Sequence, residues 1–406
     1  MKLLIAIPAL NEETSIESII QRSLAARDFI IQTSPVTEVE ITVVSDGSTD
    51  RTVQLAGLYT DRIHLIVFPI NRGYGAAIKE AWRQSDADIV GFLDADGTCD
   101  PKFFADLSTA LESRRADVAL GCRLNKDSRM PAVRRLGNLV FATLLSLFSA
   151  SQVRDTASGM RVVRRKILPK LFPLPDGLQF TPAMSARAML SSALNIIEID
   201  MPYEERVGES KLRVGKDGLR FLRVILETAF LYRPSRPFGI LAILFFLMGT
   251  LLMVQPTLFY LRHRFVEEWM IYRFLVSNLA GTTACMFGCA SVLTGRIARL
   301  SLPGEIDSTI QPLPNRFLRS RWFWAVPGML ALTGLALVTG SLLDLLRTGA
   351  TYEHWSRYIV MSVCFSIALI LLVARGMDFV LDLVEERIKY RIALETRSER
   401  ADHALV

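Results

Sequence analysis

Residues 89–97 read Ile-Val-Gly-Phe-Leu-Asp-Ala-Asp-Gly. Five uncharged residues followed by two carboxylates predict a buried strand whose carboxyl end opens onto a polar site. The two carboxylates, Asp94 and Asp96, repel each other and lose hydration, so an unpaired arrangement would be costly. A divalent cation removes this conflict, and hard oxygen ligands suit Mg²⁺ or Mn²⁺. The stretch therefore predicts a strand that ends in a metal site.

The preceding residues alternate between strand patterns and helix patterns. Nearly continuous apolar strands that alternate with helices indicate a parallel sheet covered on both faces. In such sheets, ligands bind at the carboxyl ends of the strands, where the strand order reverses. We therefore expect an α/β domain with its site at one edge of the sheet. Strands are predicted at residues 3–8, 40–45, 63–68 and 89–93, and helices at about 13–27, 50–59 and 75–85.

Two more polar clusters fall at the ends of predicted strands. The first strand runs into Pro-Ala-Leu-Asn-Glu at residues 8–12, and the second runs into Ser-Asp-Gly-Ser-Thr-Asp at residues 45–50. Taken alone, the second cluster is typical of a tight turn followed by a helix cap. Because both clusters coincide with carboxyl ends of predicted parallel strands, they are also candidates for the binding site.

A glycine-containing loop, Asn-Arg-Gly-Tyr-Gly-Ala-Ala at residues 71–77, opens the third predicted helix. Backbone N–H groups at a helix start, with Arg72 and Lys79 nearby, would suit an anion. A plain strand-to-helix connection explains the loop equally well. The spacing matches neither the phosphate loop that ends in Gly-Lys-Ser/Thr nor a Gly-x-Gly-x-x-Gly after the first strand.

Hydrophobic residues are unevenly distributed along the 406 residues. The mean hydropathy of +0.30 is high for a chain with 22% charged residues, so the apolar residues must be concentrated somewhere. Half of the residues are hydrophobic, the 24 glycines show no period and there are only five cysteines. These values exclude disordered, collagen-like and disulfide-scaffold proteins. The odd cysteine count fits a reduced protein facing the cytosol, and no histidine and cysteine positions have zinc spacing.

Four long apolar runs follow one another after residue 237, separated by charged connectors. At a rise of 1.5 Å per residue, about 20 apolar residues cross a bilayer core of about 30 Å. A buried core helix is the alternative for any single run, but four in succession favour membrane spans. The spans are predicted at residues 238–261, 274–294, 322–346 and 358–378.

The basic residues beside the spans predict their orientation. Five precede the first span and five lie between the second and third, whereas the other two loops hold three and two. Basic residues prefer the cytoplasmic side. We therefore expect the N-terminal domain, the middle loop and the C-terminus in the cytoplasm. The apolar start of the chain has a single basic residue and is interpreted as a buried strand rather than a signal peptide.

The four polar motifs at residues 8–13, 45–50, 71–75 and 94–97, taken in order, resemble those of family 2 glycosyltransferases with the GT-A fold. Each motif is weak alone, but together they are highly specific. Asp-Thr-Ala-Ser-Gly-Met-Arg at residues 155–161 and the segment from Tyr203 to Arg213 are similar to one branch of that family. This branch includes dolichyl-phosphate mannosyltransferase and bacterial polyprenyl-phosphate hexosyltransferases. The resemblance covers about residues 1–235, and the spans resemble the tails of bacterial members only in layout.

The resemblance implies a role for each matching residue. The nucleotide would be bound by residues on the first three motifs, and the sugar, diphosphate and metal by Asp94 and Asp96. Arg123 matches a basic position near the transferred sugar, and three further basic residues match positions that face phosphates. Surface charge is the alternative for Arg206 and Lys211. The nucleotide-binding candidates are Pro8, Asn11, Glu12, Asp46, Arg72, Gly73 and Lys79, the catalytic candidates are Asp94, Asp96, Arg123, Asp155 and Arg161, and the phosphate-facing candidates are Arg161, Arg206 and Lys211.

The chain departs from polymerising members of the family. It has no Gln-x-x-Arg-Trp motif, and Thr181 is followed by Pro182 and Ala183 rather than by two acids. These differences argue against a processive polysaccharide synthase. Relatives often carry Glu or Arg where Gln179 stands, so this position bears on the identity of the sugar and the acceptor.

The predicted reaction is an inverting transfer of one hexose from a UDP- or GDP-linked sugar to a polyprenyl phosphate. A lipid phosphate is already anionic at pH 7, so the missing acid after Thr181 is compatible with it. One alternative acceptor is the hydroxyl of diacylglycerol or another glycolipid, which would need a general base such as Asp155. A second alternative is a catalytically inactive membrane scaffold or flippase partner.

The expected architecture is a GT-A α/β domain with a mostly parallel sheet, followed by interfacial helices and four transmembrane helices. Apolar stretches at residues 139–148 and 219–231 suit a membrane surface, and packing inside the soluble domain is the alternative. We expect an integral protein of the cytoplasmic membrane, a nucleotide-sugar donor and no nucleic acid; a homo-oligomer is compatible with the sequence. The membrane tail would either bind the lipid or only anchor the enzyme. The expected domains are residues 1–215 (catalytic, cytosolic), 216–237 (amphipathic helix), 238–383 (four spans) and 384–406 (charged cytosolic tail).

Overall fold

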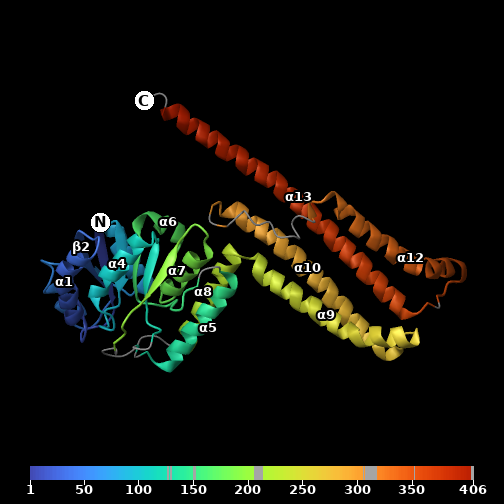
Figure 1. Cartoon of the computed structure of the whole chain (residues 1–406), viewed down its shortest axis with the longest axis horizontal. Coiled ribbons are helices and arrows are strands. Elements are labelled where there is room, and N and C mark those ends of the chain that lie inside the picture. The colour runs from blue at the N-terminus through green and yellow to red at the C-terminus, as the bar shows by residue number, and fades with distance from the viewer. Residues whose placement is uncertain are drawn as a thin grey trace. The chain divides into compact units, whose positions relative to one another are not determined.

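The structure is a computed structural model whose described residues form two compact units, Met1–Tyr232 and Arg233–Val406. Figure 1 shows the sheet and its helices in the first unit and the long helices in the second. The description covers residues 1–125, 128, 130–149, 152–204, 214–304, 306, 318–351 and 353–403, without the side chains of 214 and 392–403.

A sheet with the strand order β3-β2-β1-β4-β6-β5-β7 forms the centre of the described first unit. β6 runs antiparallel to β4 and β5, and all other neighbouring pairs are parallel. The central strands are buried on both faces, which explains their unbroken apolar sequences. The expected mostly parallel α/β sheet is thus confirmed. The strands are β1 (Lys2–Ala9), β2 (Glu38–Asp46), β3 (His64–Phe68), β4 (Ile89–Leu93), β5 (Val118–Cys122), β6 (Met160–Arg164) and β7 (Ile196–Asp200).

Helices cover both faces of this sheet. Side chains of α1 and α4 pack with Leu3, Ile5 and Ile7 of β1 in the main hydrophobic core. On the other face, the rings of Phe92 on β4, Trp82 on α3 and Phe180 on α7 pack against one another. The helices of this unit are α1 (Ile16–Thr33), α2 (Thr52–Gly57), α3 (Tyr74–Gln84), α4 (Phe104–Ser113), α5 (Ala132–Phe148), α6 (Leu168–Leu171), α7 (Phe180–Leu190) and α8 (Val214–Tyr232), with short 3-10 turns at Pro101–Phe103 and Arg165–Ile167.

The strand register brings the polar clusters to one edge of the sheet. Pro8 on β1 pairs with Val44 on β2, and Ala6 pairs with Phe92 on β4. The chain therefore leaves β1, β2 and β4 at neighbouring points on the same edge. This arrangement places the three clusters predicted from the sequence side by side.

The second unit consists of long helices, and the described residues include four that are long and apolar enough to cross a membrane. The predicted four-span tail therefore agrees with the helices of the structure. α9 packs against α10, α10 against α13, and α13 against α12. The bounds are α9 (Ser235–His263), α10 (Ile271–Ser301), α12 (Ala325–Thr348) and α13 (Trp355–His403), with 3-10 turns at Glu268–Met270 and Arg321–Trp324.

A buried ion-pair cluster joins α10 to α13. Arg296 of α10 is 4% exposed and pairs with the fully buried Asp378 of α13. The same guanidinium donates to Asp382 at 2.9 Å and to Glu385 at 3.0 Å, one and two helical turns further along α13. Arg375 donates to the other carboxylate oxygen of Asp378 at 2.9 Å. Several charges thus satisfy one another between two apolar helices.

Candidate active site

A cavity of about 520 Å³ opens at the carboxyl ends of β1, β2, β4 and β5. Residues of α5 and α8 contribute to its lining, so segments from both halves of the first unit meet there. The predicted residues that line the cavity are Pro8, Glu12, Asp46, Gly73, Asp94, Asp96 and Arg123.

Asp94 and Asp96 follow β4 directly and are held by hydroxyl groups. Asp94 Oδ1 accepts a hydrogen bond from the Tyr74 hydroxyl at 2.6 Å. Asp96 Oδ1 accepts from the hydroxyl of Thr98 at 2.7 Å and from its backbone N–H at 3.2 Å. Burial, followed by the charge of Asp94, raises the pKa of Tyr74 well above its usual value, so this phenol keeps its proton and donates it. Sequence analysis did not identify Tyr74, because it considered the glycine loop only for its backbone N–H groups and not for its side chains.

Gly159 packs directly against the Asp94 carboxylate. A Cβ atom at this position would lie 1.9 Å from Asp94 Oδ2, which is too close for any residue with a side chain unless the carboxylate moves. The contact follows from the antiparallel course of β6, because its first residue, Met160, pairs with Leu93 at the end of β4. The amino end of β6 is thereby placed beside the carboxyl end of β4.

The donor chemistry of Asp94 and Asp96 fits a divalent cation. Both side chains line the same cavity and offer hard carboxylate oxygens. Within the described part of the chain, no three His, Cys, Asp or Glu side chains cluster around a common point. Few protein ligands are usual for Mg²⁺, which completes its shell with water and substrate phosphates.

Asp46, at the end of β2, organises the glycine loop. Its Oδ1 accepts the backbone N–H of Arg72 at 2.6 Å, and its Oδ2 accepts that of Gly73 at 2.9 Å. Gly73 has a φ of +108°, and a Cβ atom there would lie 2.5 Å from the carbonyl oxygen of Asp176. The loop therefore needs glycine for both its backbone conformation and its close approach.

Asn11 joins the ends of β1 and β2 and is not among the cavity-lining residues. Its Oδ1 accepts the backbone N–H of Thr49 at 2.8 Å, and its own N–H donates to Ser48 Oγ at 3.1 Å. The next residue, Glu12, does line the cavity, and its N–H donates to Thr52 Oγ1 at 2.8 Å. Asn11 thus shapes the region in which we expected it to contact the nucleotide.

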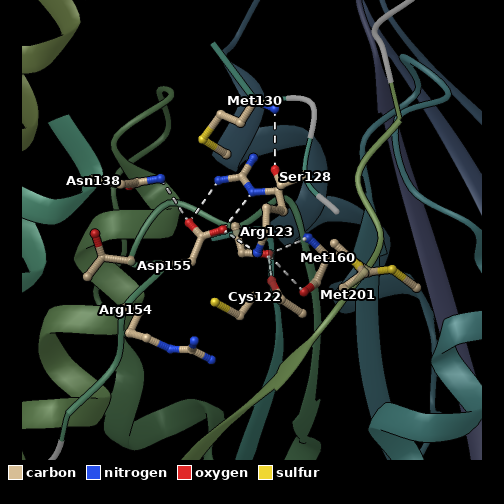
Figure 2. A network of polar contacts seen from close by, with 12 residues as sticks. Cys122, Arg123, Ser128, Met130, Asn138, Arg154, Asp155, Met160 and Met201 are labelled. Atoms are coloured by element: carbon tan, nitrogen blue, oxygen red, sulfur yellow. Dashed lines mark hydrogen bonds and ion pairs between the residues drawn. The ribbon is translucent and has the colours of Figure 1, made fainter. Parts of the chain in front are cut away.

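Arg123 presents a fixed guanidinium to the cavity. Its Nε donates to Asp155 Oδ2 at 2.7 Å, its Nη2 to Oδ1 at 2.9 Å and its backbone N–H to Oδ2 at 3.0 Å. Asn138 of α5 adds a fourth bond, from Nδ2 to Asp155 Oδ1 at 3.0 Å. Figure 2 shows these groups converging on the Asp155 carboxylate. The guanidinium carbon of Arg123 also lies 5.4 Å from the ring centre of Tyr203, which lines the same cavity.

Asp155 is fully buried and is absent from the cavity lining. Burial alone would raise its pKa, but the charge and hydrogen bonds of Arg123 outweigh burial and lower it. A carboxylate with a lowered pKa that already accepts four hydrogen bonds is a poor proton acceptor. Asp155 therefore holds Arg123 in place, and its predicted alternative use as a general base is not supported by this geometry.

Two further arginines line the cavity where α5 and α8 meet. Arg134 comes from α5 and Arg220 from α8, and the rings of Phe141 and Phe221 from the same two helices are 6.0 Å apart. Sequence analysis assigned the apolar stretches 139–148 and 219–231 to a membrane surface and did not foresee that arginines of the same two helices share a cavity with Asp94. The only sequence feature that could have indicated this part of the site was the presence of basic residues on two otherwise apolar helices.

The structure places Lys79 and the Arg72 side chain differently from our expectation. Lys79 Nζ donates to the carbonyl of Leu174 at 2.8 Å and pairs with Asp176 at 2.5 Å. The Arg72 guanidinium is 4.5 Å from the ring centre of Phe68, outside the set of cavity-lining residues. Lys79 therefore fixes a loop, and Arg72 contributes through its backbone.

The start of α3 is also filled by the protein itself. The backbone N–H groups of Gly75 and Ala76 both donate to the carbonyl oxygen of Asp176, at 2.6 and 3.1 Å. These donors are the ones that an anion at a helix start would use. The alternative of a plain strand-to-helix connection is the one that the structure supports.

Arg161 lies inside the protein rather than on the cavity. It is fully buried, and its guanidinium donates to the carbonyls of Ser158 and Thr156 at 3.1 and 2.8 Å and to Ser185 Oγ at 2.8 Å. Burial lowers its pKa to about 10. All three donor nitrogens point to protein groups, so this structure does not place Arg161 on the cavity, and its contact with an acceptor phosphate stays a prediction.

The remaining phosphate-facing candidates, Arg206 and Lys211, lie outside the described residues. Their predicted role stays a prediction.

The described residues form an α/β domain with a polar cavity at the carboxyl ends of its strands, followed by four helices long and apolar enough to cross a membrane, and comparisons identify the family. The family model described as glycosyl transferase family 2 matches residues 4–172. A dolichyl-phosphate hexose transferase of Haloferax volcanii is 34% identical over 174 residues, which cover 42% of this chain and 72% of that protein. The chain belongs to the family 2 glycosyltransferases. The expected family and enzyme class are thus confirmed.

Other relatives share shorter or less similar regions. The low-salt glycan biosynthesis hexosyltransferase Agl6 of Haloferax volcanii is 32% identical over 241 residues, covering 58% of this chain but only 56% of that protein. An undecaprenyl-phosphate 4-deoxy-4-formamido-L-arabinose transferase of Photorhabdus laumondii is 28% identical over 265 residues, covering 64% and 78%. Among solved structures, glucosyl-3-phosphoglycerate synthase from Mycobacterium tuberculosis with Mn²⁺, UDP and glucosyl-3-phosphoglycerate is 19% identical, with a TM-score of 0.43 over 56% of this chain and 80% of that chain.

Proposed function

We propose that this protein transfers one hexose from a nucleoside-diphosphate sugar to a polyprenyl phosphate at the cytoplasmic face of the membrane. The observation that carries the proposal is the composition of the cavity. Two carboxylates, Asp94 and Asp96, lie in the same cavity as Arg123, Arg134 and Arg220. Such a cavity offers metal ligands for the donor diphosphate and cations for a second phosphate.

The donor would bind at the carboxyl ends of β1, β2 and β4. Pro8, Glu12 and Asp46 line this side of the cavity and would contact the nucleoside. Asp94 and Asp96 would hold Mg²⁺ or Mn²⁺, and the metal would supply Lewis-acid stabilisation to the departing diphosphate. The Tyr74 hydroxyl donates to the Asp94 carboxylate and Gly159 packs against it, and these two contacts would hold it in place for this role.

The acceptor phosphate would enter on the side of α5 and α8. Outward-facing residues of α5 are strongly exposed and apolar, among them Leu136 at 62% and Leu139 at 57%. On α8, Leu219 is 70% exposed, and the chain enters the apolar α9 only two residues after α8 ends. Apolar helix faces of this kind suit the membrane interface, where a polyprenyl chain would remain in lipid while its phosphate reaches the arginines.

The proposed transfer is a single displacement that inverts the configuration at the sugar carbon. A phosphate oxygen is anionic at pH 7 and attacks without a general base. This chemistry agrees with the position of Asp155, the base candidate for a hydroxyl acceptor, whose carboxylate accepts four hydrogen bonds in the interior. The guanidinium of Arg123 would stabilise negative charge on the phosphates during the transfer.

Relatives named as polyprenyl-phosphate sugar transferases support the same reaction class. Dolichyl-phosphate and undecaprenyl-phosphate transferases are among the similar proteins, and each transfers a sugar-type group according to its name. We therefore favour the lipid phosphate over diacylglycerol as acceptor. The sugar is left to experiment.

The test measures donor consumption by the detergent-solubilised full chain. UDP-glucose, UDP-galactose, UDP-GlcNAc and GDP-mannose are each supplied with and without undecaprenyl phosphate and Mg²⁺. We expect one donor to be consumed only when lipid and metal are both present, and we expect EDTA or Asp96→Asn to abolish the reaction. Consumption with diacylglycerol instead would refute the proposed acceptor, and consumption of no donor would favour an inactive scaffold.

A further inference from the structure

Arg123 lines the cavity, but its hydrogen bonds are made to the buried carboxylate of Asp155. Only 9% of the residue is exposed, and Asp155 binds both its side chain and its backbone N–H. A forked contact of this kind fixes the plane of the guanidinium as well as its position. Whatever holds Asp155 in place therefore also sets how Arg123 faces the substrate.

One side chain from outside this pair completes the Asp155 carboxylate. Asn138 Nδ2 donates to Asp155 Oδ1 at 3.0 Å, the oxygen that also accepts from Arg123 Nη2. Asp155 is fully buried and Asn138 is 6% exposed, so water cannot replace this bond without rearrangement. In Figure 2 the amide of Asn138 points at the carboxylate from the side away from the Arg123 backbone.

Asn138 belongs to α5, and it is the polar member of that helix's buried face. The other buried residues of α5 are Ala142, Leu145 and Phe148. The opposite face of α5 is apolar and exposed, as described above for Leu136 and Leu139. The same helix thus combines an exposed apolar face with an amide that binds the carboxylate behind Arg123.

We propose that Asn138 is a positioning residue that orients Arg123 through Asp155 and thereby couples the placement of α5 to the transfer reaction. A shift of α5 would remove one of the four hydrogen bonds to Asp155 and loosen the fork that holds Arg123. The kinetic part of this proposal rests on the proposed function, whereas the structural part does not. Through Asn138 and Asp155, α5 would thus be linked by hydrogen bonds to the Arg123 guanidinium in the cavity.

The first test needs no substrate. Phenylglyoxal modifies arginine guanidinium groups, and peptide mass spectrometry of the full chain in detergent measures the modification rate of Arg123. In Asn138→Leu we expect this rate to rise about fivefold, because a buried hydrogen bond to a charged group is lost. A rate equal to that of the wild type overturns the proposal.

Asn125→Leu is the matched control. Asn125 lies two residues after Arg123, and its amide donates to the carbonyls of Cys122 and Met201, at 3.2 and 2.7 Å, rather than to Asp155. We expect the Arg123 modification rate in this variant to stay within about twofold of wild type, because the Asp155 carboxylate keeps its donors. An equal increase in both variants would show that any loss of packing exposes Arg123, and it would overturn a specific role for Asn138.

The second test is kinetic and uses the donor identified by the consumption assay with undecaprenyl phosphate. In Asn138→Leu we expect kcat to fall about tenfold while the donor KM stays within about twofold, since Arg123 acts on the phosphates during transfer. The double variant Asn138→Leu with Asp155→Asn should lose little more than Asp155→Asn alone. Additive losses would refute action through Asp155.

The two tests separate this proposal from the proposed function. If the wild type consumes no donor, the proposed function fails, and the phenylglyoxal experiment still decides whether Asn138 holds Arg123. Thermal unfolding of each variant identifies a general loss of fold. Should Asn138→Leu fail to fold, Asn138→Ala removes the same hydrogen bond without adding bulk and takes its place in both tests.

Discussion

Two buried arginine–carboxylate pairs, one in each unit, differ in what surrounds them. Arg123 pairs with Asp155 beside a cavity and is 9% exposed, whereas Arg296 pairs with Asp378 between two helices and is 4% exposed. The first pair leaves its arginine among the cavity-lining residues. The second is flanked by Asp382 and Glu385, which both accept from Nη2 of Arg296.

The difference shows how one chemical pair serves two purposes. A buried ion pair costs desolvation energy whether or not it is useful, so its worth depends on the other contacts of its members. In the helical unit, those contacts are further charged side chains: the acids Asp382 and Glu385 bind Arg296, and Arg375 binds Asp378. The resulting cluster joins α10 to α13. Beside the cavity, Asp155 also binds Asn138 and Arg123 also lines the cavity, so this pair positions a cation there. We expect variants of the Arg296–Asp378 pair to affect stability and variants of the Arg123–Asp155 pair to affect catalysis.

The largest effect is expected from Arg296→Met. Removal of the cation leaves buried Asp378 without its nearest partner, which should lower the free energy of unfolding by about 3 kcal/mol. Thermal unfolding of the detergent-solubilised full chain measures this, and donor consumption per folded molecule should stay unchanged. Lys389→Met is the control, because its exposed pair with Glu385 on the same helix should contribute only about 0.5 kcal/mol. Equal losses in the two variants would contradict the comparison.

Arg123→Lys should produce the reverse outcome. Lysine keeps the charge but cannot form the two-pronged contact with Asp155, so donor consumption should fall about 100-fold. The unfolding midpoint should change much less than in Arg296→Met. A variant that keeps wild-type kcat while losing stability would show that this pair, too, is only structural.

An intermediate effect is expected from Tyr74→Phe, which removes the hydroxyl that holds Asp94 Oδ1 and leaves the ring in place. We expect affinity for Mn²⁺, measured by electron paramagnetic resonance of the free ion, to fall about tenfold, in line with the loss of a hydrogen bond to a charged group. Tyr203→Phe removes another cavity-lining phenol and serves as the control. Unchanged Mn²⁺ affinity in Tyr74→Phe would separate Asp94 from metal binding.

The smallest effect is expected from Lys79→Met. Lys79 pairs with Asp176, whose side chain is 64% exposed, so the loss of stability should be below about 1 kcal/mol. The donor KM should be unchanged, because Lys79 bonds to the loop at Leu174 and Asp176 instead of lining the cavity. A clear increase in donor KM would restore the sequence-based prediction that Lys79 binds the nucleotide.

The sequence predicted those parts of the site that follow from local patterns. Asp46, Asp94 and Asp96 end apolar strands, and parallel pairing necessarily brings such ends together. The four apolar runs predicted the spans for an equally simple reason, namely their length. Each of these features depends on a pattern within about ten to twenty consecutive residues.

The parts that the sequence did not predict depend on contacts between distant segments. Arg123 and Asp155 were predicted as site residues, but their hydrogen bonds to each other and to Asn138 were not. Arg123 follows β5, Asn138 lies on α5 and Asp155 precedes β6, so no local pattern connects them. Arg161 was expected to face a phosphate because it belongs to a family motif, whereas its place in a buried strand brings its side chain to Thr156 and Ser185. The antiparallel insertion of β6 between β4 and β5, a long-range feature of the sheet, brings the Asp155 and Arg161 segment to this position.

The close approach of Gly159 to Asp94 has a consequence for genetics. Gly159 carries no functional group, so a mutational scan directed at charged or polar side chains would pass over it. Yet any side chain there would occupy the space of a carboxylate oxygen, at 1.9 Å from Asp94 Oδ2. Substitution of this glycine should therefore behave as a loss-of-function allele that leaves every ionisable group of the cavity intact.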